Sequence, residues 1–280
     1  MSITELLSEL FEYIINVEDL YMIDQMPEKA EMRSMKKVVF FGSIGLAKRI
    51  LVEIILKQDI QLVGVCCEKN INAWRQEESV YDYCVKNNIA ILEDSDVIAA
   101  RADLGISVRY NRIINQNVIN SFSLGIVNTH GGILPEYRGS YCNVNAILNG
   151  EKEYGVTLHY IDAGIDEGDI IAIKKVDILP DHTGFDLYHI SESLCYDLIA
   201  DNIIELLNGT NLRIPQSEFI KNGHKTAVYR AKDTLQRKRI MLSEINEELT
   251  LKIVRAFDSD VHEPAYIDVA GRKIYFRMKY

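Results

Sequence analysis

The sequence lacks several features that would assign it to common classes of protein. It holds only five cysteines, an odd number, and no Cys-x-x-Cys pair. This pattern argues against a disulfide framework or a structural zinc site and is typical of a reducing cytoplasm. No uncharged apolar run approaches the roughly 20 residues that cross a bilayer, and the acidic, polar-interrupted N-terminus does not resemble a secretory signal. The six histidines show no metal-ligand spacing. We therefore expect a cytoplasmic protein without a membrane segment or a metal.

Positive charge is also scarce. The chain carries 31 basic and 41 acidic side chains, a net charge of −10, whereas a general nucleic-acid binder normally carries the opposite sign. The charge is uneven, because residues 216–280 hold 13 basic and 9 acidic side chains. This mildly basic tail is either a solvated surface or a region that meets an anion such as a diphosphate.

The remaining composition is that of a globular α/β protein. Of the 280 residues, 48% are hydrophobic and 26% are charged, so the chain can bury a sizeable core. Apolar runs that predict buried strands alternate with helical patterns, which predicts a doubly wound, mostly parallel sheet. The strands are expected at 35–43, 61–67, 89–93, 104–108, 124–130, 155–162 and 169–178, and the helices at 2–26, 46–58, 73–88, 113–122, 141–149, 183–208 and 244–258.

The chain divides into three predicted regions. Residues 1–35 form an N-terminal helical extension and linker, which either packs on the domain surface or contacts a partner. Residues 36–215 form the main α/β domain. Residues 216–280 form a small α+β appendage, in which a helix precedes a hairpin that turns at Ala270-Gly271.

A glycine turn follows the first strand, but it does not predict a dinucleotide site. Gly42 and Gly45 give Gly-x-x-Gly, which lacks the second glycine of the Gly-x-Gly-x-x-Gly fingerprint. We interpret it as a tight strand-to-helix turn.

Three polar residues in the middle of the chain predict chemistry. Asn128 and His130 close a buried strand and lie on the same side of it by alternation. They lie at the carboxyl end of a parallel strand, where open α/β sheets bind ligands. Asp166 follows in a loop between two glycines, where a carboxylate can reach the imidazole. An amide, an imidazole and a carboxylate suit acyl transfer to an amine. No nucleophile elbow is present, so direct transfer without an acyl-enzyme is favoured.

These residues resemble the formyltransferases that use N10-formyltetrahydrofolate. The family pattern has Asn-x-His, a Leu-Pro-x-Tyr-Arg-Gly loop and an Asp-x-Gly, and the chain has Asn128-Thr129-His130, the matching loop at 134–139 and Asp166. The resemblance covers roughly residues 36–215 and implies a Rossmann-like formyltransferase fold with 216–280 as a C-terminal subdomain. It implies Asn128, His130 and Asp166 as the catalytic residues.

The resemblance also implies binding residues. The family holds the folate pterin in the loop before the catalytic Asp and in an upstream strand-to-helix segment, which here implies Arg112, Ile113, Ile114, Asp162, Gly164 and Ile165. The alternative for Ile113 and Ile114 is plain core. Arg138 and Asn143 are the candidates for substrate binding. Asn143 and Asn145 either make the acceptor wall polar or belong to a solvated helix face, and His159 is interpreted as structural.

The chain departs from the family pattern beside the catalytic residues. The family often has Ser at the position of Gly132, and a Pro and an aromatic residue where this chain has Cys142 and Asn145. We interpret Cys142 as a small buried residue.

Three branches of the family differ in the acceptor. The purine-biosynthetic enzyme resembles the main domain alone, and the initiator-tRNA enzyme adds a larger, strongly basic C-terminal domain. The third branch, the sugar N-formyltransferases, carries a short helix-plus-hairpin tail like 216–280. The resemblance therefore favours an amino sugar, one linked to a nucleotide and used for cell-surface glycans, as the acceptor, with a homodimer and no nucleic-acid partner. The alternatives are an enzyme that formylates methionyl-tRNA and an inactive folate-binding module.

Overall fold

The computed structural model describes residues 35–69 and 78–279. Residues Lys36–Tyr280 form one compact unit. The predicted helix at 2–26 and the beginning of the predicted helix at 73–88 lie outside the described residues. Along the described part of the chain, no helix combines the length and apolar character needed to span a membrane.

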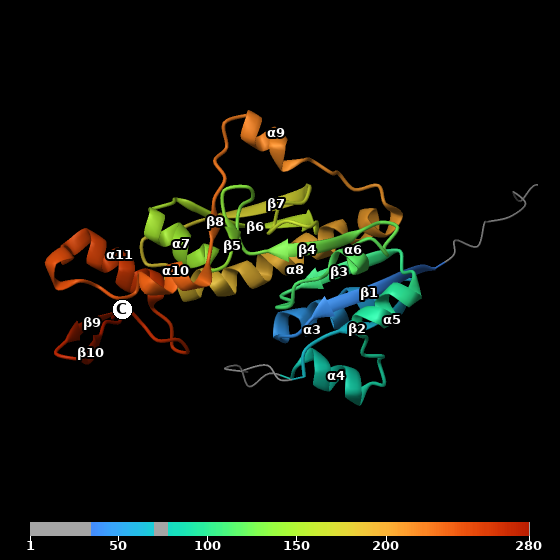
Figure 1. Ribbon diagram of the computed structural model, residues 1–280, viewed down its shortest axis with the longest axis horizontal. Coiled ribbons are helices and arrows are strands. Elements are labelled where there is room, and N and C mark those ends of the chain that lie inside the picture. The colour runs from blue at the N-terminus through green and yellow to red at the C-terminus, as the bar shows by residue number, and fades with distance from the viewer. Residues whose placement is uncertain (1–34, 70–77, 280) are drawn as a thin grey trace, which may run out of the picture. The chain divides into compact units, whose positions relative to one another are not determined.

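A six-stranded sheet organises this unit, in the order β2, β1, β3, β4, β6, β7 (Figure 1). The strands are β1 (Lys36–Gly42), β2 (Ile60–Cys66), β3 (Leu104–Val108), β4 (Ile126–His130), β6 (Glu153–Tyr160) and β7 (Ile170–Asp177). The first four strands in this order run parallel, whereas β6 pairs antiparallel with β4, and β7 pairs antiparallel with β6. The predicted α/β class with a mostly parallel sheet is therefore confirmed.

Helices follow the strands through the α/β part. They are α3 (Gly45–Glu53), the 3-10 turn η1 (Ile55–Lys57), α4 (Val80–Lys86), α5 (Asp94–Ala100), α6 (Gln116–Ile119), α7 (Cys142–Asn149) and the long α8 (Gly184–Asn208).

Both faces of β1 are buried, which is why its sequence is a continuous apolar run rather than an alternating one. Val38 and Phe40 belong to a cluster with residues of α3 and α8. Val39 and Phe41 point the other way and pack with residues of α5 and α6. The sheet is thus covered on both sides at β1.

Several boundaries differ from the sequence expectations. The helix expected at 46–58 ends at Glu53, and the strand expected at 89–93 is reduced to a single bridge between Val65 and Ile91. Helix α5 was not expected, and it begins at a capping box made by Glu93 and Asp96. The helix expected at 113–122 spans only Gln116–Ile119. These differences arise at short elements, where side-chain caps outweigh weak periodicity.

The C-terminal part holds more elements than the predicted helix and hairpin. They are α9 (Gln216–Lys221), β8 (Val228–Tyr229), α10 (Ala231–Gln236), η2 (Leu242–Glu244), α11 (Glu247–Phe257), β9 (Tyr266–Val269) and β10 (Arg272–Tyr275). The hairpin turns at Ala270 and Gly271, which both have positive φ, as a two-residue turn of this kind requires. Strand β8 pairs in parallel with β5 (Arg138–Gly139). The tail therefore contacts the Leu-Pro-x-Tyr-Arg-Gly loop at 134–139 directly.

Helix α8 tests the capping argument. Thr183 accepts a hydrogen bond from the Asp186 N–H, and the Asp186 carboxylate accepts one from the Thr183 N–H. Thr183→Ala removes the cap, so we expect the free energy of unfolding to fall by about 1 kcal/mol. Thr183→Ser keeps the hydroxyl and should lose much less. Urea unfolding of both variants measures this difference, and equal losses in the two would contradict the capping interpretation.

Candidate functional site

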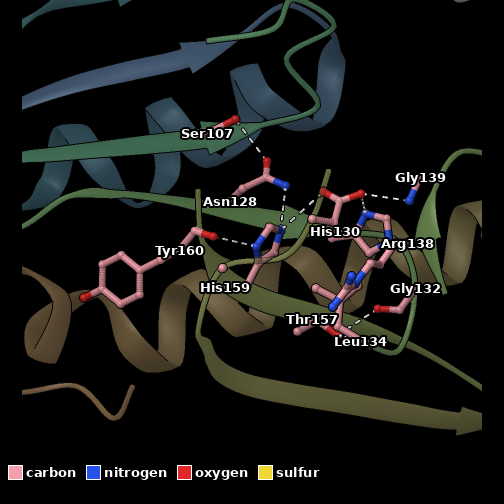
Figure 2. Close-up of polar contacts among 12 residues, drawn as sticks. Ser107, Asn128, His130, Gly132, Leu134, Arg138, Gly139, Thr157, His159 and Tyr160 are labelled. Atoms are coloured by element: carbon pink, nitrogen blue, oxygen red, sulfur yellow. Dashed lines mark hydrogen bonds and ion pairs between the residues drawn. The ribbon is translucent and has the colours of Figure 1, made fainter. Parts of the chain in front are cut away.

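The site is built at the carboxyl end of β4. Asn128 and His130 lie on the same side of this strand, and its antiparallel partner β6 places His159 opposite Asn128 and Thr157 opposite His130 (Figure 2). Both strands are buried at this point, so each polar side chain needs a partner there. The register therefore brings together two pairs of polar residues. The two members of each pair are about 30 positions apart in the sequence.

Hydrogen bonds fix the orientation of the Asn128 amide. Its Oδ1 accepts a bond of 3.0 Å from the Ser107 hydroxyl, and its Nδ2 donates a bond of 3.2 Å to His159 Nε2. His159 Nδ1 donates to the backbone oxygen of Tyr160 at 2.7 Å, which leaves Nε2 as an acceptor. Asn128 thus has one further N–H, and its side chain lines the cavity described below.

His159 is held in its neutral form. Burial lowers the pKa of this imidazole to about 4, against the attraction of the nearby Asp166 carboxylate, which raises it. A neutral ring at physiological pH keeps Nε2 free to accept from Asn128. His159 therefore has the structural role that the sequence predicts, and the group that it orients is the amide of Asn128, a predicted catalytic residue.

His130 is buried, and each nitrogen of its ring faces an oxygen. Its Nε2 donates to the backbone oxygen of Tyr137 at 2.6 Å, and its Nδ1 lies 3.4 Å from Asp166 Oδ2. The same carboxylate accepts a bond of 2.8 Å from the Gly139 N–H, and its other oxygen lies 3.6 Å from His159 Nε2. The structure therefore brings Asn128, His130 and Asp166 to one point, as Figure 2 shows for the two strand residues and their partners. Their catalytic roles remain predictions.

The loop after β4 explains the glycine at position 132. A Cβ at Gly132 would lie 2.5 Å from the Tyr137 backbone oxygen and 2.8 Å from His130 Nε2. A Cβ atom in a protein does not approach other non-bonded heavy atoms to less than 3.0 Å. The loop therefore has no room for the serine that the family pattern often has at this position. Cys142 lies against the same ring, with Sγ 3.6 Å from His130 Nε2. Burial raises the pKa of its thiol, which agrees with the interpretation as a small buried residue.

A cavity of about 940 Å³ opens over this point. Asn128, His130 and Asp166 line it. Other lining residues come from the glycine turn, the segments after β2 and β3, the start of α4, α8 and the tail: Ile44, Gly45, Glu68, Ser79, Arg109, Tyr110, Phe185, Tyr188, Leu235, Lys238, Phe257, Ser259, His262 and Glu263 among them. The volume is that of a typical small-molecule site. Because one wall comes from residues beyond 230, the tail is part of this cavity.

The predicted folate residues lie outside the cavity lining. The side chains of Ile113 and Ile165 are exposed by 98% and 61%, so the core alternative for Ile113 is wrong. Ile114 packs partly against the core cluster under β1. Arg112 forms an ion pair with Glu93, in which Nη1 lies 3.9 Å from Oε2. The role of this segment in folate binding stays a prediction.

The remaining predicted folate residues belong to the loop before Asp166. Asp162 is exposed and accepts a hydrogen bond of 3.0 Å from the N–H of Gly164.

The predicted substrate residues differ in their surroundings. Asn143 lines the cavity and donates to the backbone oxygen of Gly184 at 2.6 Å. Arg138 is not in the lining, since its guanidinium is engaged by Gln216 and Glu167. The role of Arg138 in substrate binding stays a prediction.

Asn145 belongs neither to the acceptor wall nor to a solvated face. It is 1% exposed, donates to Thr234 Oγ1 at 2.9 Å and accepts from Arg237 at 3.2 Å. It therefore attaches α7 to the tail helix α10. Nothing in the local pattern around Asn145 could have indicated this, because both partners are about 90 positions away.

Sequence reasoning missed three residues of this region. Arg109 lines the cavity with its Nη2 2.7 Å from Ser191 Oγ and its guanidinium over the Tyr188 ring at 4.8 Å. Its φ of 50° is positive, which is uncommon for a residue other than glycine and is visible only in the fold. Ser107 and Gln216 carried no sequence signal.

Comparisons with known proteins show the family of this chain. The family model for formyl transferase matches residues 60–198. A methionyl-tRNA formyltransferase from Acetivibrio thermocellus is 30% identical over 206 residues, which are 69% of this chain and 64% of that protein. The chain belongs to the formyl transferase family. Its match spans a little under two thirds of the length of such curated relatives.

Solved structures show the same fold over nearly the whole chain. A 4-N formyltransferase from Francisella tularensis has a TM-score of 0.74 at 22% identity, and the match covers 88% of this chain and 98% of that one. An N-formyltransferase from Helicobacter canadensis, solved in complex with folinic acid and dTDP-3-aminofucose, has a TM-score of 0.70 at 24% identity and covers 86% of each chain. At these identities the likeness establishes the fold.

The neutral state of His159 predicts a pH dependence of stability. The unfolded chain binds one more proton at this site than the folded chain between about pH 6.5 and pH 4. The contribution of the neutral His159 ring to the free energy of unfolding is therefore complete above pH 6.5, and it is lost as the pH falls from 6.5 to 4. His159→Gln, whose amide oxygen can accept from Asn128, cannot take up this proton. Between pH 7 and pH 4.5 we expect the wild type to lose roughly 1–3 kcal/mol more of its unfolding free energy than the variant.

Denaturant unfolding at a series of pH values measures both curves. Carboxylates that titrate in the same range cancel in the difference between the two proteins. Parallel curves would mean that burial does not keep this ring neutral.

Proposed function

We propose that the chain transfers a formyl group from N10-formyltetrahydrofolate to the amine of an amino sugar that is linked to a nucleotide. The observation that carries the proposal is the convergence of Asn128, His130 and Asp166 at one cavity. An amide, an imidazole and a carboxylate at these positions can stabilise an oxyanion and move a proton, which are the two requirements of acyl transfer to an amine.

The proposed mechanism assigns one task to each residue. The sugar amine attacks the formyl carbon of the folate, and the carbonyl oxygen becomes negative. The free N–H of Asn128 donates to that oxygen. His130 supplies the second donor, for which its Nε2–H exchanges the Tyr137 carbonyl for the substrate oxygen. Asp166 faces Nδ1 of the ring, and this pair takes a proton from the attacking amine. The same proton passes to N10 of the folate as the carbon–nitrogen bond breaks, so that the carbonyl forms again and tetrahydrofolate leaves.

The folate is proposed to bind beside Asp166. Ile165, which precedes Asp166 in the chain, and Ile113 both expose apolar side chains, and apolar surface suits a flat heterocycle such as a pterin. The folate supplies the formyl group as a substrate, and no metal has a part in the proposed reaction.

The proposed acceptor rests on the cavity and on the structural neighbours. The fixed cation of Arg109 and the rings of Phe185 and Tyr188, which are nearly parallel with centroids 6.5 Å apart, suit an anionic group and a base. WlaRD, a sugar 3N-formyl transferase whose structure was determined in the presence of dTDP and 5-N-formyl-THF, shares the fold with a TM-score of 0.69. A homodimer in the cytoplasm is part of this proposal.

Methionyl-tRNA is the second candidate acceptor, because the sequence relatives near 30% identity have that name. The charge argues against it, since the whole chain is at −10 and residues 216–280 carry only four more basic than acidic side chains. Binding of initiator tRNA that weakens steeply with salt would favour this candidate over a sugar.

The test of the proposal is a panel of nucleotide-linked amino sugars incubated with the protein and N10-formyltetrahydrofolate. Mass spectrometry detects the gain of a formyl group on one of them. His130→Ala should lower kcat by about 10²–10³ or more because it removes an oxyanion donor.

The matched control is His224→Ala, which changes a half-exposed histidine outside the cavity lining and should keep wild-type turnover. Wild-type turnover in His130→Ala would refute the assignment. Formyl gain on none of the sugars, with formylation of methionyl-tRNA, would replace the acceptor but keep the mechanism.

A further inference from the structure

Gln216 is a buried polar residue that the proposed mechanism does not use. It is 4% exposed at the first position of α9, directly after Pro215. It lies beyond residues 60–198, which match the family model. A buried amide must have hydrogen-bond partners, and the identity of those partners indicates what it does.

The Gln216 side chain makes four hydrogen bonds to three residues, which are Arg138 in β5 and Asp166 and Gly168 in the loop after β6. Oε1 accepts from Arg138 Nε at 3.1 Å and from Arg138 Nη2 at 2.7 Å. Nε2 donates to the backbone oxygens of Asp166 at 2.8 Å and of Gly168 at 2.9 Å. The amide group therefore uses both of its N–H groups and both lone pairs of its oxygen.

These bonds act on the backbone on each side of the Asp166 carboxylate. Asp166 has a φ of 51°, in the left-handed region, which aspartate adopts at some cost unless its surroundings hold it there. Gln216 holds the carbonyl of this residue. Its other partner, Arg138, precedes Gly139, whose N–H donates to Asp166 Oδ2 at 2.8 Å. One side chain thus connects the main chain of Asp166 with the strand that binds its carboxylate.

A second contact from the tail acts on the same strand. Gly139 has a φ of 89°, and a Cβ there would lie against the backbone oxygen of Tyr229 in β8. β8 pairs with β5, so the Gly139 N–H is aimed at Asp166 from a backbone that the tail also supports. Gln216 and β8 therefore contact Asp166 and the strand that binds its carboxylate from the region beyond residue 215.

We infer that Gln216 is a positioning residue, which sets the Asp166 carboxylate against His130 Nδ1 and so makes the segment after α8 a functional part of the site. This inference rests on the proposed function only for its kinetic readout. The catalytic groups remain Asn128, His130 and Asp166, and Gln216 acts through the last of them. A displacement of about 1 Å in such a group lowers a rate by about 10²-fold.

Two variants test the positioning role. Gln216→Met has a similar volume and no hydrogen bonds. Gln216→Glu keeps an acceptor for Arg138 but turns an oxygen toward the two carbonyls. We expect both to lower kcat by about 10- to 100-fold while the KM of the acceptor changes less than about twofold. The matched control is Glu218→Met, on the same helix but exposed, which should leave kcat unchanged.

Hydrogen exchange at the Gly139 amide gives a readout that does not depend on activity. In the folded Gln216→Met protein we expect this amide to exchange at least 10-fold faster than in the wild type, while amides of β1 keep their rates. An unchanged Gly139 rate, or a wild-type kcat in this variant, would overturn the inference. If the wild type formylates no acceptor, the proposed function fails, and the Gly139 rate still decides the role of Gln216.

Discussion

The antiparallel pairing of β6 with β4 is the constraint on which the rest of the site depends. It places the buried ring of His159 directly opposite Asn128, whose side chain lines the cavity. Burial keeps His159 neutral and its Nδ1–H donates to a backbone carbonyl, so Nε2 is unprotonated and accepts from Asn128. The amide is therefore oriented before any ligand binds, and the energy of that arrangement comes from folding.

Asp166 depends on contacts of a different kind. It lies in a loop with left-handed backbone, and neither sheet pairing nor core packing determines where its carboxylate points. The Gly139 N–H and the Gln216 amide supply that direction from two other segments. The two halves of the site thus differ physically, because one is set by strand register and the other by side-chain bonds to a loop. Substitutions around the Asp166 loop should therefore lower the free energy of unfolding less than substitutions in β4 and β6.

The sequence was most informative where a pattern is local. The buried run at 38–41 and the alternation at 155–160 predict strands, and the amphipathic pattern at 183–208 predicts the long helix. Each of these patterns reflects forces between neighbours in the chain, so a single sequence displays them. The short helices at 94–100 and 116–119 depend on individual side-chain caps and carried a weaker signal.

The sequence alone determined the α/β class, the resemblance to formyltransferases and the three polar residues at the centre of the site. Only the tertiary structure decided that Asn145 and Gln216 are buried connectors, that Arg138 is held by Gln216, and that the tail forms a wall of the cavity. The physical reason is distance along the chain. A hydrogen bond between residues 78 or 89 positions apart leaves no periodicity in the sequence, because its geometry exists only after the sheet has placed both partners.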